Sequence, residues 1–358
     1  MDPPVAKVTV RQLGPERDNA LSRIAIAGIH AYALTLDGTT VLASLRGTSM
    51  YPIASTTKIM TAYLAVSRLT FGDTLTVTPA DVALSEAQAR IGGEEMPVRT
   101  GERLTVGQTL YALLLPSANN AAVLLAERTA GTQAAFVRLM NETATRVGMT
   151  HTHYADASGL SRATQSSAVD LARLASRALR VPAFARIVRT RSADLPVWTR
   201  VTNLNRLLWT YPGAIGVKTG FTDPAGNCLV FAARRTIAGR EVTIIGTLLG
   251  EPTTQRMFAD ATDLLNAGFA AATPVQVLAA GTAVGRLYPK GSHTATARLV
   301  LTAPLAMAPY RRTAPLFLHI LRHATHGRFS WRLAVHSNEG PTIAILPLRA
   351  VRIPDAVR

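Results

Sequence analysis

Apolar and polar residues follow different periods in successive parts of the chain. From Ile29 the pattern indicates a strand, an Asp37-Gly38 turn and a second strand that ends near Leu45. Beyond Ser55, apolar positions recur at intervals of three and four residues, which is typical of an amphipathic helix. We therefore expect a two-stranded hairpin followed by a helix that begins at this serine.

The middle of the chain continues with helices and then strands. Helical spacing recurs in five further segments, which are residues 105–115, 118–129, 132–148, 167–179 and 256–269. Three short apolar or β-branched runs, separated by turn-forming residues, predict adjacent antiparallel strands. These runs are residues 215–221, 228–233 and 242–249. The pattern predicts an α+β fold in which helices flank an antiparallel sheet.

The two ends of the chain differ from this middle part. Residues 1 to about 23 are polar and irregular, and we assign them no structure. After Thr273-Pro274 the sequence consists of short alternating segments, such as residues 296–301, broken by glycine and proline. We predict a larger domain over residues 24–272 and a small β-rich C-terminal domain over residues 273–358.

The composition is that of a folded, basic protein. Of 358 residues, 48% are hydrophobic, which is enough for a sizeable core, and the formal net charge is +16. The arginines are scattered, so a generally basic surface is favoured, with contact to a membrane surface or an anionic cell wall left open. Zinc-finger spacings, ribonucleoprotein motifs and Walker loops do not occur, so no nucleic-acid or nucleotide binding is expected.

The cellular compartment is not evident from the sequence. The first four residues show neither the basic nor the apolar region of a signal peptide, so either the protein is cytoplasmic or its leader was removed. The single cysteine, Cys228, excludes an intrachain disulfide and favours a buried, inert thiol in an apolar strand.

Lysine is rare in this chain, and two of its four lysines lie in motifs that suggest catalysis. Of 38 basic residues only Lys7, Lys58, Lys218 and Lys290 are lysine. Arginine keeps its proton near neutral pH, whereas a desolvated lysine can become a base. Ser55 and Lys58 lie three residues apart on the predicted helix, so Lys58 Nζ can reach Ser55 Oγ and activate it as a nucleophile.

Two further motifs complete this pattern. Ser117-Ala118-Asn119 falls in the turn between two predicted helices, and Lys218-Thr219-Gly220 falls on a predicted strand. Their order and separation resemble the serine penicillin-recognising enzymes, whose motifs are S-x-x-K, S-x-N and K-T-G. In a purely structural alternative, Ser117 caps a helix and Lys218 is a solvated strand residue. That alternative does not explain three motifs in order, each in its expected setting.

Within that superfamily the chain most resembles the low-molecular-mass D-alanyl-D-alanine carboxypeptidases, over about residues 28 to 271. The segments that carry the resemblance are residues 52–62, 117–122, 203–208 and 216–222. The resemblance implies a DD-peptidase/β-lactamase-like catalytic domain. It also implies peptidoglycan stem peptides as substrates, β-lactam antibiotics as covalent inhibitors, no cofactor and a location outside the cytoplasm.

The resemblance further implies a role for each motif residue. Ser55 would be acylated by the penultimate D-Ala carbonyl, with Lys58 as general base, and Ser117 would relay a proton to the leaving D-Ala. Asn119 would hold Lys58 and the substrate amide. The terminal carboxylate would bind Lys218 and Thr219 of the Lys218-Thr219-Gly220 motif. Backbone N–H groups of Ser55 and Phe221 would form the oxyanion hole.

Two other candidate sites are weaker. An arginine near the start of the last catalytic-domain helix often helps to hold the carboxylate in these enzymes, and Arg256 is the candidate here. His151 and His153 with Asp156 could be read as a metal cluster, but two histidines two residues apart in a loop are more often structural. No metal site is expected.

Three alternative functions remain. A class A β-lactamase needs a glutamate between the second and third motifs, in a Glu-x-x-Leu-Asn context, and Glu142 does not fit that context. A D,D-endopeptidase would cut cross-links with the same machinery. A silent wall-binding scaffold would not need Lys58 beside Ser55. An amphipathic C-terminal anchor is not expected, because Pro347 and Pro354 interrupt the last segment.

Overall fold

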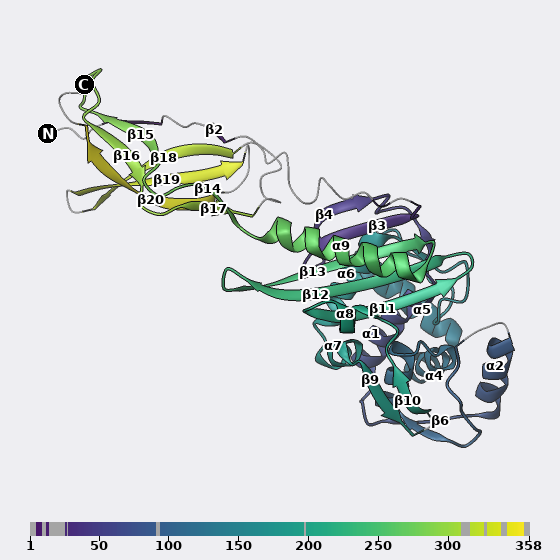
Figure 1. The fold of residues 1–358 in the computed structure, drawn as a ribbon. Coiled ribbons are helices and arrows are strands. Elements are labelled where there is room, and N and C mark those ends of the chain that lie inside the picture. The colour runs from purple at the N-terminus through teal and green to yellow at the C-terminus, as the bar shows by residue number, and fades with distance from the viewer. Residues whose placement is uncertain are drawn as a thin grey trace. The chain divides into compact units, whose positions relative to one another are not determined.

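The chain forms two compact units in the computed structural model, which describes residues 5–8, 12–13, 26, 28–90, 94–196, 198–308, 316–325, 328–337 and 342–353 (Figure 1). One unit is residues 24–269. The other combines residues 1–23 with residues 270–358, so it is built from both ends of the chain. The sequence-based division at 272/273 did not include the N-terminal residues in the smaller unit.

A five-stranded antiparallel sheet forms the centre of the larger unit. Its strands, in spatial order, are β11 (Ala214–Thr222), β12 (Gly226–Ile237), β13 (Arg240–Glu251), β3 (Ala31–Leu36) and β4 (Thr40–Leu45). The predicted hairpin and the three predicted adjacent strands are all present. Strands β12 and β13 extend beyond their apolar runs, because the pairing continues to Ile237 and Arg240 at a tight turn.

Helices cover both faces of this sheet. Ala33 and Ile245 point into the main core with most of the helices, whereas their neighbours Leu34 and Ile244 lie against Gly268 of α9 on the opposite face. The helices are α1 (Lys58–Arg68), α2 (Pro79–Arg90), α3 (Val106–Leu114), α4 (Asn119–Ala130), α5 (Gln133–Arg146), α6 (Ala168–Leu179), α7 (Pro182–Arg189), α8 (Leu207–Thr210) and α9 (Thr254–Ala272).

Short elements fix the loops that carry the motifs. A 3₁₀ turn, η1 (Ala54–Thr57), precedes α1, so the α-helix begins at Lys58 and not at Ser55 as expected. Thr105 and Gln108 form a capping box that starts α3. Three small strand pairs hold other loops, namely β5 (Tyr51–Pro52) with β8 (Gln165–Ser166), β6 (Thr74–Thr76) with β7 (Arg103–Thr105), and β9 (Ser192–Leu195) with β10 (Trp198–Thr202).

The smaller unit is a β-domain with a seven-stranded sheet and a separate strand pair. The sheet order is β1 (Val5–Val8), β15 (Ala283–Tyr288), β16 (Ala297–Leu301), β20 (Thr342–Arg352), β19 (Arg328–Ser337), β18 (Leu316–Thr325) and β2 (Gln12–Leu13). The pair is β14 (Val275–Leu278) with β17 (Leu305–Met307). One face of the sheet forms an apolar core that includes Leu299, Leu318 and Leu333.

The assignment of no structure to residues 1–23 was wrong where the structure describes them. Residues 5–8 pair with β15, and residues 12–13 pair with β18. These strands are too short for a periodic signal, and their partners lie nearly 300 residues away in the sequence. Residues 344–352, within the segment where a terminal anchor helix was not expected, belong to β20 (Thr342–Arg352), and residues 354–358 lie outside the described part.

Candidate active site

Lys58 lies at the centre of a buried hydrogen-bond cluster. Its Nζ is 2.7 Å from Ser55 Oγ, 2.7 Å from Asn119 Oδ1 and 2.9 Å from the carbonyl oxygen of Ser158. The amide and carbonyl oxygens can only accept hydrogen bonds. A neutral Lys58 amine therefore donates its two protons to Asn119 and Ser158, which leaves its lone pair for the Ser55 hydroxyl proton. This is the geometry of a nucleophile and its base.

Burial adjusts the proton affinity of both motif lysines. The Lys58 side chain has no exposed surface, and burial lowers its pKa to about 7, against the opposing influence of Asp156 and Glu95. Lys218 is also buried, and burial together with the charge of Lys58 lowers its pKa. A lysine whose pKa is near 7 is neutral in a large fraction of molecules at neutral pH, as a general base must be.

Glu95 fixes the orientation of the Asn119 amide. Asn119 Nδ2 donates to Glu95 Oε1 over 3.0 Å, and the backbone N–H of Asn120 donates to Glu95 Oε2 over 2.8 Å. Because a carboxylate only accepts, the amide must direct its NH₂ to Glu95 and its oxygen to Lys58. The second bond also satisfies a backbone donor in the first turn of α4.

Asp156 shapes the turn that supplies the third Lys58 partner. Its Oδ2 accepts hydrogen bonds from the backbone N–H groups of Ser158, Gly159 and Leu160. Gly159 has a φ of 89° and lies so close to η1 that an added Cβ would fall 1.9 Å from the carbonyl oxygen of Ala54. The turn is therefore packed directly against the segment that carries Ser55, and the Ser158 carbonyl is held toward Lys58.

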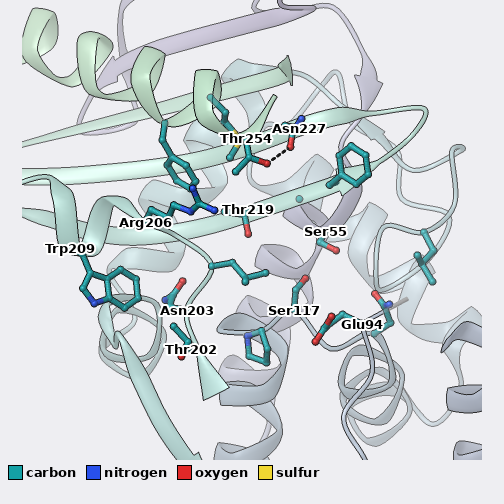
Figure 2. A pocket seen from close by; sticks show the side chains of 18 residues that line it. Ser55, Glu94, Ser117, Thr202, Asn203, Arg206, Trp209, Thr219, Asn227 and Thr254 are labelled. Atoms are coloured by element: carbon teal, nitrogen blue, oxygen red, sulfur yellow. Dashed lines mark hydrogen bonds between the residues drawn. The ribbon is translucent and has the colours of Figure 1, made fainter. Parts of the chain in front are cut away.

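Ser117 lies between α3 and α4 in an uncommon backbone conformation. Its φ is 80°, a region that side chains other than glycine rarely occupy. Its Oγ is buried and has no hydrogen-bond partner among the described residues. Figure 2 shows the Ser117 side chain beside Ser55 in the same pocket. The hydroxyl is thus available to a group that enters the pocket.

Strand β11 brings the third motif against the 3₁₀ turn that carries Ser55. Lys218 Nζ donates to the carbonyl oxygen of Thr219 over 3.0 Å. Gly220 approaches the start of η1 so closely that an added Cβ would lie 2.8 Å from the backbone nitrogen of Ser55. Only glycine allows the strand and the 3₁₀ turn to meet in this way.

A pocket of about 600 Å³ opens over these residues (Figure 2). Exposed apolar side chains, including Leu204, Trp209 and Phe221, line it together with the polar motif residues. The complete lining is Ser55, Glu94, Pro116, Ser117, Asn119, Leu160, Thr202, Asn203, Leu204, Arg206, Trp209, Thr219, Gly220, Phe221, Asn227, Thr254, Met257 and Phe258. Such a mixture of apolar walls and few polar groups is typical of a peptide-sized ligand site.

Comparison with known proteins identifies this arrangement. A sequence profile of the peptidase S11 family, D-alanyl-D-alanine carboxypeptidase, matches residues 18–251. The chain belongs to this family of serine peptidases. Members act through a covalent serine intermediate and bind β-lactams.

Individual relatives agree with the family assignment. The D-alanyl-D-alanine carboxypeptidase of Streptomyces sp. strain K15 is 35% identical over 280 residues, which cover 72% of this chain and 92% of that protein. The solved structure of the Streptomyces K15 DD-transpeptidase has a TM-score of 0.63 at 33% identity, covering 69% of this chain and 98% of that one. The carboxypeptidase DacD of Francisella tularensis, at 21% identity and a TM-score of 0.67, shares the fold over 94% of this chain and 96% of its own.

The structure does not bring Arg256 into the carboxypeptidase pocket. Arg256 is an exposed residue on α9 and makes an ion pair with Asp260 over 3.4 Å, whereas its neighbours Met257 and Phe258 line the pocket. Arg206 lines the pocket instead. Its guanidinium lies over the ring of Phe258 and extends toward Thr219 in Figure 2. The helical register of α9 turns residue 256 outward.

The remaining sequence candidates have other partners. The His151 backbone N–H donates to Asp170, and His153 pairs through its backbone with Gln165, while Asp156 orders its own turn. Within the described ranges, the side chains contain no group of three or more potential metal ligands. Cys228 is buried, and burial raises its thiol pKa to about 12.

Sequence reasoning missed two residues of this site. Glu95 and Arg206 reach it through tertiary contacts, and neither lies at a fixed spacing from Ser55. Arg206 lies in segment 203–208, which carries part of the resemblance, but no role was predicted for it. Asp156 was named as a candidate metal ligand, and its link to Lys58 through Ser158 depends on packing against η1. The run Asp156-Ala157-Ser158-Gly159 is rich in turn-forming residues, and it was the signal available for that turn.

Proposed function

We propose that Ser55 is the nucleophile of this carboxypeptidase and that it removes the terminal D-alanine from peptidoglycan stem peptides. The observation that carries the proposal is the triple contact of Lys58 Nζ with Ser55, Asn119 and Ser158. Neutral Lys58 takes the Ser55 proton as Oγ attacks the penultimate D-Ala carbonyl. The C–N bond then breaks, D-alanine leaves as an amine, and water hydrolyses the remaining ester.

The other motif residues serve the same reaction. The unpartnered Ser117 hydroxyl passes a proton to the leaving amine. The backbone N–H groups of Ser55 and Phe221 stabilise the negative oxygen of the tetrahedral intermediate, and the close approach of Gly220 to Ser55 supports this pairing. Asn119 holds the substrate amide while it orients Lys58.

The terminal carboxylate binds at the end of the pocket where Thr219 and Arg206 meet. Arg206 binds the carboxylate in place of Arg256, the residue expected from the sequence, because the Arg206 guanidinium faces the pocket. The buried amine of Lys218, which donates to the Thr219 carbonyl oxygen, lies next to Thr219, and the negative charge of a bound carboxylate favours its protonated form. A planar guanidinium is well suited to a carboxylate, since it can donate two parallel hydrogen bonds.

A defined peptide tests the reaction type. From a muropeptide that ends in D-Ala-D-Ala, the enzyme should release one free D-alanine per peptide molecule, and Ser55→Ala should abolish the release. An endopeptidase would instead shorten cross-linked dimers and leave the terminus of the monomer intact. Benzylpenicillin should add its mass once to the wild type and not to Ser55→Ala. A stable adduct on Ser117 would contradict the assignment of the nucleophile.

We also propose that the protein acts outside the cytoplasm, in contact with an anionic cell-wall polymer. Within the part of the chain that the structure describes, no helix is long and apolar enough to span a membrane. In the β-domain, exposed Lys7 pairs across strands with exposed Arg286, and Arg286 pairs with exposed Arg298. The described residues of this unit include no Asp or Glu. Like charges directly opposite each other are unfavourable without a counter-ion, which a polyanion would supply.

A salt-dependent binding assay tests the polymer contact. The double variant Arg286→Thr/Arg298→Thr should elute from immobilised inorganic polyphosphate at a lower salt concentration than the wild type, because its binding displaces fewer counter-ions. Equal elution of the two proteins would contradict the polymer contact, as would binding of the wild type to anionic vesicles but not to polyphosphate.

A further inference from the structure

The active-site pocket has opposite charges at its two ends. Among the described residues that line it, Glu94 is the acidic side chain and Arg206 the basic one. Figure 2 shows Arg206 beside Thr219 on one side of Ser55 and Ser117, and Glu94 on the other side. The chain has 38 basic and only 22 acidic residues. The negative charge of the exposed Glu94 is therefore opposite in sign to the net charge of the protein.

The backbone holds Glu94 at the edge of the catalytic motif. The backbone N–H of Asn119 donates to the carbonyl oxygen of Glu94 over 2.8 Å, and the next residue, Glu95, is bound to Asn119 and Asn120. Glu95 therefore uses its carboxylate inside the protein. Glu94, one residue earlier, directs its side chain to the pocket, where no hydrogen bond or ion pair with a described residue engages its carboxylate.

The direction of the bound peptide follows from the proposed function, on which this inference rests. The last residue of the substrate places its carboxylate near Thr219 and Arg206, and Ser55 attacks the carbonyl one residue earlier. The preceding residues must then continue away from Arg206, past Asn119, at about 3.3–3.6 Å per residue. The side chain that precedes the two D-alanines thus passes the end of the pocket that Glu94 occupies.

We infer that Glu94 is a specificity-determining residue that binds a positively charged amine on the substrate residue preceding D-Ala-D-Ala. The substrate class is a stem peptide whose third residue carries a free amino group on its side chain. The carboxylate makes an ion pair with this ammonium group, while Arg206 holds the terminal carboxylate at the other end. The two opposite charges also set the direction in which the peptide enters.

Two matched peptides test the inference. One is an acyl-L-lysyl-D-Ala-D-Ala with a free ε-amine, and the other is the same peptide with that amine acetylated. We expect the wild type to release D-alanine from both, with kcat/KM about fivefold higher for the free amine, as for one partly exposed ion pair. Glu94→Gln should remove the preference, and Glu94→Lys should reverse it, because a lysine at this position repels the free ε-amine of the peptide. The preference should also decrease as salt increases.

The controls separate the two proposals. Glu86→Gln removes an exposed carboxylate on α2 that pairs with Arg90 and does not line the pocket, so it should keep the wild-type preference. Release of D-alanine from both peptides without any preference, or a preference that persists in Glu94→Gln, would overturn the role of Glu94 and leave the carboxypeptidase reaction intact. No release from either peptide would overturn the proposed reaction and, with it, this inference.

Discussion

Lys58 Nζ and Ser55 Oγ lie 2.7 Å apart although one belongs to α1 and the other to the 3₁₀ turn that precedes it. The change from 3₁₀ to α geometry occurs between the two residues. The two side chains still meet, because residues three apart lie on one side of either helix type. The contact occurs at a lysine without exposed surface, so water does not compete for the amine.

Replacing each motif lysine by arginine should separate their roles. Lys58→Arg keeps the charge but cannot accept the serine proton, so acylation by benzylpenicillin should slow by about 10²- to 10⁴-fold. Lys218→Arg should be milder, since its proposed task needs positive charge and not proton transfer. Stopped-flow acylation measures both rates, and melting temperatures identify variants that fail to fold. Wild-type rates in both variants would contradict the division of roles.

The acylation rate should depend on pH through Lys58. Because the neutral amine is the base and its pKa is about 7, the rate should increase as pH rises through 7 and then level off. The charged groups that face Lys58 are Asp156, Glu95 and Lys218. Glu95→Gln removes a negative charge that raises the Lys58 pKa, so the midpoint should move to lower pH. Glu241→Gln, on the exposed hairpin of β13, should leave the midpoint unchanged. A midpoint that moves upward in Glu95→Gln would exclude this electrostatic role.

Arg206 and Arg256 should differ in their effect on substrate binding. Arg206→Ala should raise KM for a D-Ala-D-Ala peptide about tenfold, the size expected when one charge-assisted hydrogen bond is lost. Arg256→Ala should stay close to the wild type, because that side chain pairs with Asp260 outside the pocket. Steady-state kinetics with a carboxylate-blocked peptide amide provides the control, since the Arg206 effect should then disappear. The reverse order of the two variants would restore Arg256 as the carboxylate ligand.

The penicilloyl-enzyme should persist far longer than the peptide acyl-enzyme. Two glutamates lie between the second and third motifs, Glu127 on α4 and Glu142 on α5, and neither lines the pocket. Neither can therefore activate water against the ester in the manner of a class A β-lactamase. Mass spectrometry over time after removal of free penicillin measures the adduct. Rapid loss of the adduct, with no D-alanine released from peptides, would instead indicate a β-lactamase.

The stability of the larger unit should decrease as pH rises above the ordinary range of carboxyl groups. The Glu251 side chain is buried beside Asp260, and burial and this neighbour raise its pKa to about 7, despite the opposing charge of Arg256. The folded protein then binds an extra proton between pH 4.5 and 7, so the stabilisation is lost as pH rises through that window. Glu251→Gln should show a smaller difference in melting temperature between pH 5 and pH 8. An unchanged difference would exclude Glu251 as the titrating group.

The sequence was most informative where chemistry requires a fixed spacing. Ser55 and Lys58 are one turn apart in any helix, so their contact followed from the sequence. Asn119 and Lys218 could be placed only through the resemblance, because their approach depends on how α4 and β11 pack against η1. Arg206 was not recognised, since nothing in a loop sequence reports which way a side chain faces. Arg256 was expected at the pocket, but on α9 Met257 and Phe258 line it instead, because the helical register decides which side chains face the pocket.

The same limit applied to the fold. Long periodic segments such as α5 and α6 were located to within two residues at each end, because many positions contribute to one signal. Helix α2 was missed because the residues it buries, Asp81 and Ser85, are polar and give no apolar period. The short helices α7 and α8 and strands β1 and β2 were also missed. Their few residues are held by contacts with distant segments, such as the pairing of Lys7 with Arg286.

The pairing of β1 with β15 and of β2 with β18 sets the order in which the chain can fold during synthesis. The sheet of the smaller unit cannot be completed until β20, which ends at Arg352, has left the ribosome, by which time residues 24–269 are already available to fold. Strand β1 therefore stays unpaired until the whole larger unit and β15 have been synthesised. Strand β1 then pairs with β15 across the whole intervening chain, and the entropy cost of closing such a loop grows only slowly with its length.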